Sequence, residues 1–583
     1  MKADFIIKNA MVYMTIRQCF EKRDVAVAGE KIFAVSPALS YPGVNVIDAE
    51  GKYLIPGLID IHMHIESSMT YPMEFSRITL PYGVTTVVAD AHEIANVFGL
   101  EGVRWFMDQQ TEQDIFYAIP SSVPATTMEM ETSGAQIGER ETAFLADDDR
   151  VLCLGEVMNF KDLTSEQDTL TKRLVNLCRR KGAGRALRIE GHCPKITGED
   201  LCRFIYAGVD ADHTQQSPES VLEKTDLGMF LELQHKSLTK EVVEVVCSHR
   251  LYENVALITD DTMPDTLLKG HLNQIVSHAV RMGMPVEKAI YCATYTPARR
   301  MHLDDRGFIG PGKLADLVLL NDLETFVPYM VFKNGRCVFE QAQDSVNTAA
   351  SVREARKEAQ IPEHFRHSVV CRRAVQNDFI LRAGKNCRRV RANVIEIQKF
   401  GNFTRRVEKE LNVKDGVVCW QEAGLCLAVI FERHGKNGNV AYGLIDGAFC
   451  KPGAAATTWS HDSHNLFVLG NSPEDMVIAQ NRILELQGGY VTASEGKLLA
   501  EACLPVGGII SDRSVEELAD QLSEVRASMS RLGYENNNEI MSMSTLSLPV
   551  SPELKMTDFG LLDVRSQEKI PLIEEFDTDE DID

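Results

Sequence analysis

The most constraining feature of this sequence is a series of eight short apolar runs, each separated from the next by a longer stretch typical of a helix. The runs are Leu54–Ile61, Val84–Ala89, Ile115–Ile119, Val151–Leu154, Ala186–Ile189, Gly208–Ala211, Met229–Leu233 and Val255–Ile258. Strands that alternate with helices favour parallel β/α units. Eight such units over about 250 residues predict an α/β fold, a (β/α)8 barrel of the TIM type.

Strand patterns also occur on both flanks of this region. Residues 4–50 read as short strands separated by turns, and strand patterning returns at Ala315–Leu320 and Pro328–Phe339. We interpret the two flanks, 1–55 and 305–342, as one small composite β domain.

The predicted barrel then occupies residues 56–304. Residues 343–368 are polar and are interpreted as a linker, and residues 369–583 have enough apolar content for a further α+β domain. The chain ends in an acidic tail, IPLIEEFDTDEDID, which we expect to fray.

Composition narrows the class of protein. The 61 basic and 84 acidic residues give a net charge of −23, which disfavours nucleic acid or an anionic membrane as the main partner. The 14 cysteines form no C-x-x-C pair, as is typical of a reducing compartment. The N-terminus lacks the apolar core of a signal peptide, and no uncharged apolar stretch is long enough to span a bilayer. A cytoplasmic enzyme without a membrane partner is therefore expected.

Residues able to bind metals follow the apolar runs repeatedly. They are His62 and His64, Asp90, His92 and Glu93, Glu156, Glu190 and His192, Asp212 and His213, and Asp260 and Asp261. In TIM barrels the catalytic groups project from the carboxyl ends of the strands. These residues are therefore expected to converge at one end of the barrel.

The residue types suggest a site for two divalent ions. His62 and His64 lie on the same side of an extended segment, so that both imidazoles can bind the first ion. Glu156 could bridge the two ions, His192 and His213 could hold the second, and Asp260 could ligate the first ion and handle protons. Each element alone also has an ordinary structural explanation, such as a hydrogen-bonded histidine pair or a helix N-cap.

With these residues in view, the sequence resembles the amidohydrolase superfamily, in PGLIDIHMH at 56–64 and GPGKLADLVLL at 310–320. Within that superfamily it most resembles the adenine deaminase family. The matching stretches include HIESSM at 64–69, GVTTVVADAHEIANVFG at 83–99, GEVMN at 155–159, TDD at 259–261, SHDSHN at 460–465 and LPVSPELKMTD at 548–558.

The resemblance implies hydrolysis of adenine to hypoxanthine and ammonia by a metal-bound hydroxide, with two manganese or iron ions per chain. It implies six metal ligands, of which Glu156 and Asp260 are also catalytic: His62, His64, Glu156, His192, His213 and Asp260. The sequence departs from the family pattern at Thr214, at Thr262 and in LELQHKS after the seventh run. Because none of these positions is a predicted metal ligand, the departures affect the identity of the substrate more than the binding of the metals.

Other residues are expected near the substrate. His92 and Glu93 could orient it or support a ligand, or could form a salt bridge at a helix start. Asp261 is expected to contact substrate or to fix its loop. If the C-terminal domain caps the barrel mouth, His461, Asp462 and His464 would reach the pocket; otherwise they form a hydrogen-bonded turn.

Alternative functions remain at this stage. The same metals could hydrolyse another aminopurine, a pterin or a cyclic amide, as dihydroorotase and hydantoinase relatives do. The zinc nucleoside deaminases are disfavoured because no P-C-x-x-C follows the H-x-E at His64–Glu66. A degenerate barrel kept as a scaffold would have lost ligands, and none of the six is lost. The expected partners are a purine base and water, in a homo-oligomer.

Overall fold

The computed structural model describes residues 3–180, 186–341 and 360–578. They form two compact units that interleave along the chain. The first unit comprises Met1–Ala91, Trp105–Ser121 and Gly138–Ala359, and the second comprises His92–Arg104, Ser122–Ile137 and Gln360–Asp583. Of the predicted linker 343–368, residues 343–359 lie outside the described residues.

Two parallel sheets form the centre of the first unit. The larger has the order β10-β9-β8-β7-β6-β14 and the smaller the order β11-β12-β13. Their bounds are β6 Leu58–His64, β7 Val84–Asp90, β8 Asp114–Ile119, β9 Val151–Val157, β10 Arg188–Gly191, β11 Ala211–Asp212, β12 Phe230–Leu233, β13 Val255–Leu257 and β14 Asp260–Asp261. All eight apolar runs predicted as strands thus overlap strands of the structure. The mixed α/β class is confirmed.

Amphipathic helices alternate with these strands. They include α1 Pro72–Thr79, α3 Glu139–Leu145, α5 Leu170–Arg180, α6 Gly198–Tyr206, α7 Pro218–Asp226, α8 Lys240–Ser248, α10 Leu272–Arg281 and α11 Val286–Arg300. In α10 the buried residues Leu272, Ile275, Val276 and Ala279 recur with helical spacing and form one apolar face. Helix α7 begins after Ser217, whose hydroxyl accepts a hydrogen bond from the Ser220 amide. Local sequence therefore fixes both the buried faces and the starts of helices.

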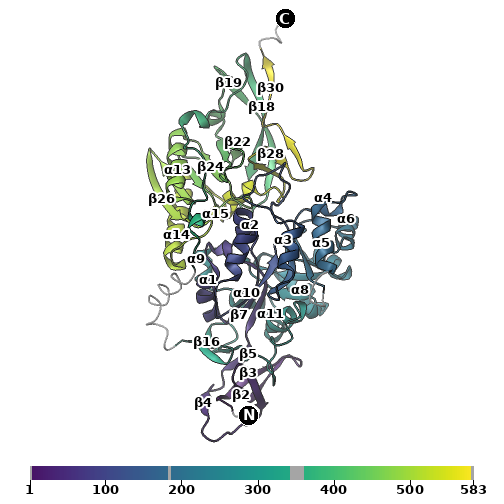
Figure 1. Cartoon of the computed structure of the whole chain (residues 1–583). Helices are drawn as coiled ribbons and strands as arrows, with labels where there is room; N and C mark the ends of the chain where they lie inside the picture. Colours follow the sequence, from purple (N-terminus) through teal and green to yellow (C-terminus); the bar gives the residue numbers. More distant parts are fainter. Residues whose placement is uncertain (1–2, 181–185, 342–359, 579–583) are drawn as a thin grey trace. The chain divides into compact units, whose positions relative to one another are not determined.

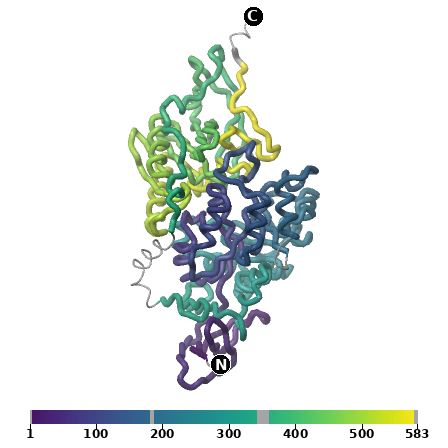
Figure 2. Tube along the Cα trace, viewed as in Figure 1, coloured from purple at the N-terminus to yellow at the C-terminus, as the bar shows by residue number. Residues whose placement is uncertain are grey.

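A third sheet of the first unit joins the two ends of its sequence. Its order is β17-β16-β15-β5-β1-β2-β3, with β4 beside β1. The strands are β1 Phe5–Met14, β2 Cys19–Ala28, β3 Lys31–Ser36, β4 Asn45–Asp48, β5 Tyr53–Pro56, β15 Leu317–Leu320, β16 Pro328–Lys333 and β17 Arg336–Glu340. Strand β15 pairs antiparallel with β5, so the chain returns to its N-terminal strands (Figures 1 and 2). Strand β6 starts two residues after β5 ends and leads into the parallel sheets.

The second unit is built on a ten-stranded sheet in the order β20-β19-β18-β22-β21-β24-β23-β25-β26, with β30 beside β18. The strands are β18 Cys387–Ile397, β19 Thr404–Lys414, β20 Val417–Val418, β21 Cys426–Phe431, β22 Val440–Asp446, β23 Ala454–Thr457, β24 Leu466–Gly470, β25 Gly489–Ser494, β26 Lys497–Cys503 and β30 Ile573–Thr578. Helices α13 Pro473–Leu486 and α14 Val515–Leu532 pack against the β23–β26 end of the sheet (Figure 1). A three-stranded sheet of β27 Leu554–Thr557, β28 Gly560–Asp563 and β29 Glu568–Ile570 completes the unit.

The expectation of a frayed tail was wrong as far as Thr578. Strand β30 pairs antiparallel with β18 through residues up to Thr578. Strand β18 is basic, and the guanidinium groups of Arg389 and Arg391 lie over the ring of Phe576. A basic neighbouring strand thus stabilises the acidic tail. Residues 579–583 lie outside the described residues. No helix in the described parts of the chain is both long enough and apolar enough to cross a membrane.

Candidate metal centre

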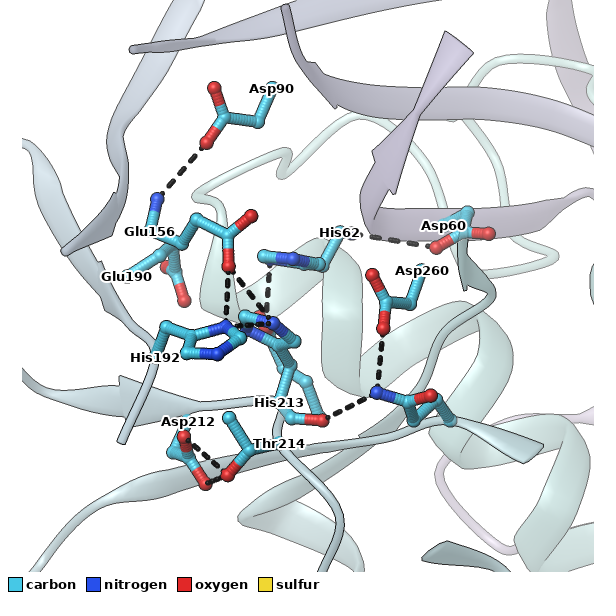
Figure 3. A network of polar contacts seen from close by, with 12 residues as sticks. Asp60, His62, Asp90, Glu156, Glu190, His192, Asp212, His213, Thr214 and Asp260 are labelled. Atoms are coloured by element: carbon cyan, nitrogen blue, oxygen red, sulfur yellow. Dashed lines mark hydrogen bonds and ion pairs between the residues drawn. The ribbon is translucent and has the colours of Figure 1, made fainter. Parts of the chain in front are cut away.

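The six predicted metal ligands come together at the carboxyl ends of the parallel strands of the first unit. Figure 3 shows His62, Glu156, His192, His213 and Asp260. His62 and His64 end β6, and Glu156 lies near the end of β9. His192 and His213 directly follow β10 and β11, and Asp260 opens β14. Strand β14 pairs with β6 so that Asp260 lies opposite Met63, between the two histidines.

Glu156 is at the centre of this cluster. Its Oε2 lies 2.8 Å from His192 Nδ1 and 3.1 Å from His213 Nε2, while its Oε1 lies 3.4 Å from His64 Nε2. His64 Nε2 is also 3.5 Å from Asp260 Oδ1. One carboxylate therefore contacts two histidines with one oxygen and a third histidine with the other, an arrangement that suits a group bridging two ions.

The donor set fits divalent metal ions. Ligand atoms of His62, His64 and Glu156, and again of Glu156, His192 and His213, all lie within 4.8 Å of one another. Among the described residues, neither His62 Nε2 nor His213 Nδ1 has a hydrogen-bond partner, although both atoms are buried. Buried polar atoms without partners are uncommon unless they serve an ion, a water or a reaction. Imidazole and carboxylate groups are suitable ligands for manganese, iron or zinc.

Neighbouring groups orient the ligands. His64 Nδ1 donates a hydrogen bond to the main-chain oxygen of Asp90 at 3.0 Å, which directs Nε2 toward Glu156 and Asp260. Asp90 Oδ2 accepts a hydrogen bond from the Glu156 amide at 3.0 Å. His62 Nδ1 lies 3.3 Å from Glu232 Oε2, so its Nε2 faces away from that carboxyl group. Such contacts fix the tautomer and the direction of metal-binding histidines.

Burial and charge act in opposite directions on the ionisable groups. Burial alone would raise the pKa of Glu156, but His213 and His192 hold it well below the usual range. Burial lowers the pKa of His62, and neighbouring His213 lowers it further. Glu156 is therefore ionised and His62 neutral, but the other imidazoles differ. Despite burial, Asp260 and Glu156 raise the pKa of His64 well above its usual range, and Glu156 raises the pKa of His213 to about 9. Binding of metal ions would displace these protons.

Asp260 and Asp261 have different surroundings. Asp260 Oδ1 faces His64, whereas Asp261 Oδ1 accepts a hydrogen bond of 2.5 Å from the Ser67 hydroxyl. Asp260 is buried and Asp261 is partly exposed. The two neighbouring carboxylates are thus oriented by different partners.

Within the second unit, buried residues from two distant segments form a cluster: His92, Glu93, His461, Asp462 and His464. Glu93 Oε1 lies 2.6 Å from His461 Nδ1, and Glu93 Oε2 contacts His464 Nε2. Asp462 Oδ1 is 3.4 Å from His461 Nδ1, and His92 Nε2 is 3.7 Å from Glu93 Oε1. The structure therefore joins HEIANV at 92–97 to SHDSHN at 460–465, although sequence analysis treated them separately.

Comparison with known proteins identifies the family. The amidohydrolase family matches residues 53–338 and the adenine deaminase C-terminal domain matches residues 402–568. An adenine deaminase 2 of Oenococcus oeni is 46% identical over 98% of this chain and 99% of its own length. An adenine deaminase of Clostridium perfringens is 46% identical over 97% of this chain and 98% of its own. The chain belongs to the adenine deaminase family.

Solved structures that match this chain have lower sequence identity to it than these relatives do. An enamidase is 16% identical with a TM-score of 0.44, covering 58% of this chain and 97% of its own. A beta-aspartyl dipeptidase of Fervidobacterium islandicum is 22% identical with a TM-score of 0.43, covering 58% of this chain and 96% of its own.

Thr214 and Thr262, which were expected to concern the substrate, are both buried. The Thr214 hydroxyl donates to Asp212 Oδ2 at 2.8 Å, and this carboxylate also binds the Lys224 ammonium at 2.7 Å. Thr262 is buried one residue after β14. Thr214 thus supports the strand end that carries His213.

Two polar residues, one in β12 and one directly after it, contact predicted ligands but were not expected from the sequence. Glu232 contacts His62, and the Gln234 amide donates to Asp260 Oδ2 at 2.6 Å. Both interrupt an apolar strand with a spacing of two residues, which places their side chains on one face. The alternation of apolar and polar residues in LELQ could have indicated these two residues. Neither of them is a histidine, the residue type that drew attention to the other positions.

Proposed function

We propose that this chain hydrolyses adenine to hypoxanthine and ammonia at the centre formed around Glu156. Membership of the adenine deaminase family, through relatives of almost the same length, supports the substrate. The observation that supports the chemistry is the buried set of three histidines placed around the two oxygens of Glu156.

We also infer that the two parallel sheets are arcs of one closed (β/α)8 barrel. The Asp210 amide donates to the Ile189 oxygen at 3.1 Å and so connects the chain before β11 to β10. At the other junction, residues 255–261 run from β13 in the smaller sheet into β14 in the larger. Both junctions are what a closed ring of eight strands requires.

In this proposal two divalent ions, manganese or iron, are held by residues of the first unit. His62, His64 and Asp260 would hold the first, His192 and His213 would hold the second, and Glu156 would contribute to both. When bound, such ions make water a stronger acid and thereby supply a nucleophile near neutral pH.

The protein residues handle the protons of the reaction. The oxygen of water forms a bond to C6 of adenine, and Asp260 accepts the proton that this oxygen loses. The proton then passes to the departing amino group, the C6–N bond breaks, and ammonia leaves. Glu156 shares in this transfer, because both carboxylates lie within 3.5 Å of His64 Nε2. A positioned acid or base of this kind contributes ~10²–10⁴ in rate.

Metal analysis and turnover of Glu156→Gln test the proposal. Wild-type protein expressed with manganese or iron is expected to carry two ions per chain and to release ammonia from adenine, with hypoxanthine as the product. Glu156→Gln keeps the size of the side chain but removes a charge and one metal-binding oxygen, so we expect loss of the second ion and of nearly all turnover, with an unchanged circular dichroism spectrum.

The outcomes separate the parts of the proposal. At most one tightly bound ion in the wild type would exclude the bridging role. Turnover of another aminopurine, a pterin or a cyclic amide in place of adenine would show that the proposed substrate is wrong. The proposed metal centre would be unaffected by that result. Full activity of Glu156→Gln would show that another group bridges the ions.

A further inference from the structure

The side chain of Gln234 connects two of the residues placed in the metal centre. Gln234 follows β12 directly and is buried. Its Nε2 donates to Asp260 Oδ2 at 2.6 Å and to the main-chain oxygen of His213 at 3.1 Å. An amide nitrogen carries two hydrogens, so these two bonds use both of them. One side chain thus ties the end of β11 to the start of β14.

We propose that Gln234 is a positioning residue for Asp260, which holds the Asp260 carboxylate so that its Oδ1 is directed at the metal ligands. This proposal rests on the function proposed above. An amide N–H can only donate, so it occupies a lone pair of Oδ2. Oδ1, 3.5 Å from His64 Nε2, is left as the oxygen that faces the ligands. Oδ2 is therefore anchored to Gln234, and the direction of Oδ1 is fixed with it.

The backbone at Asp260 explains why an anchor is needed. Asp260 has φ +60°, in the left-handed region that a residue with a side chain seldom adopts, and β14 is only two residues long. An extended strand would fix the direction of the side chain, but this short segment does so less firmly. A buried carboxylate also requires donors to replace water, and the amide supplies one.

Of the two adjacent carboxylates, Gln234 contacts that of Asp260. By contrast, Asp261 is anchored by the Ser67 hydroxyl at 2.5 Å and does not depend on Gln234 for that bond. Removing the amide is therefore expected to affect Asp260 selectively.

The test compares Gln234→Leu with Gln216→Leu. Leucine has nearly the volume of glutamine but no donor. Gln216 is a matched control, because it is also buried and donates to Asp212 Oδ2 at 2.5 Å and to the Thr214 oxygen at 2.6 Å, but not to Asp260. Both variants are combined with Asp260→Asn, and kcat, KM and metal content are measured for all of them.

We expect Gln234→Leu to lower kcat ~10–100-fold, the usual effect of removing a group that supports a metal ligand. KM should change little, because the interaction orients Asp260 and does not bind the base. In the Asp260→Asn background the same substitution should have almost no further effect, because residues that act as a unit are not additive. Gln216→Leu should have the same effect in both backgrounds.

A second readout does not depend on turnover. The rate at which a chelator removes manganese from the loaded protein should rise in Gln234→Leu, and the melting temperature of the metal-free protein shows whether the variant folds. If Gln234→Leu does not fold, Gln234→Asn, which keeps the donor on a shorter side chain, must fold and show the same selective loss.

Additive effects of Gln234→Leu and Asp260→Asn, or unchanged kcat and metal release in a folded Gln234→Leu protein, would overturn the positioning role. Absence of adenine turnover in the wild type would instead overturn the proposed substrate, and the metal-release comparison would still decide the role of Gln234.

Discussion

Asp260 and Asp261 are adjacent carboxylates that we expect to differ in function. Asp260 Oδ1 faces His64, whereas Asp261 is bound to the Ser67 hydroxyl. Asp260→Asn should lower kcat by ~10²–10⁴, the contribution of a general acid or base. Asp261→Asn should lower it less, or act mainly on KM. Steady-state kinetics and metal analysis of both variants make the comparison. Loss of metal and rate in Asp261→Asn, with both kept in Asp260→Asn, would reverse the assignment.

For single residues, the sequence predicts the metal ligands better than it predicts the residues that orient those ligands. His62, His64, Glu156, His192 and His213 could be identified because each follows or ends an apolar run. Gln234 could not be identified in the same way. The Gln234 amide reaches Asp260 through one hydrogen bond between residues that are 26 positions apart. The two residues are neighbours only because of how the strands are arranged in the fold.

Strands β7 and β9 illustrate how the elements hold the centre together. Asp90 ends β7 and its carboxylate reaches past β8 to the Glu156 amide on β9. A Cβ atom at Gly155 would lie 2.1 Å from Asp90 Oδ2 and 2.6 Å from its Cγ. Glycine at this position therefore leaves the space that the Asp90 carboxylate occupies.

Gly155→Ala should displace Asp90 and with it the main chain at Glu156. We expect a loss of ~1–3 kcal/mol in the free energy of unfolding, as for other overpacked sites, and weaker metal binding. Thermal unfolding and metal titration measure the two effects. The control is Gly138→Ala, whose Cβ would meet only the end of the flexible Glu141 side chain, at 3.2 Å. Metal affinity equal to that of the wild type would show that Asp90 does not hold Glu156 in place.

The elements could largely be predicted from periodicity, but their termini and partners could not. The run Gly208–Ala211 contains only the first residue of β11, because two residues pair there before the chain turns toward His213. The tail was expected to fray on its charge alone. Its pairing with β18 depends on a basic strand about 180 residues earlier, and no local pattern shows that.

At the scale of the whole molecule, the two units interleave: residues 92–104 and 122–137 belong to the second unit, although they lie within the predicted barrel 56–304. Helix α2, His92–Met107, begins inside the barrel region of the sequence, yet the ring of Phe98 stacks on Phe365 at 3.7 Å and Glu93 pairs with His461. These contacts are aromatic and ionic, and they join residues more than 260 positions apart. Apolar periodicity identifies a helix but not the partner of its faces, so the assignment of His92–Arg104 of α2 to the second unit required the structure.

The stability of the second unit should depend on pH through Lys555. This residue lies in β27 and is fully buried, and its ammonium donates to the main-chain oxygen of Asn402 at 3.0 Å. Within the described parts of the chain, no ion pair reaches it. Burial lowers the pKa of Lys555 from 10.5 to about 7.

The direction of the effect follows from proton binding. Below pH 7 the amine is protonated in both states, and folding carries the full cost of burying its charge. Between pH 7 and 10.5 the unfolded chain still binds a proton that the folded chain has released, so the free energy of unfolding rises with pH. Lys555→Met removes this contribution. The variant should exceed the wild type at pH 6 by on the order of a few kcal/mol, and the difference should shrink toward pH 10.

Urea unfolding between pH 6 and 10 measures this difference. Trp420 and Trp459 lie in the second unit and Trp105 in the first, so fluorescence reports mainly on the unit that contains Lys555. Lys451→Met replaces an exposed lysine of the same unit and controls for the loss of a surface charge. A difference between wild type and Lys555→Met that stays constant, or that grows with pH, would mean that Lys555 remains protonated in the folded protein across this range.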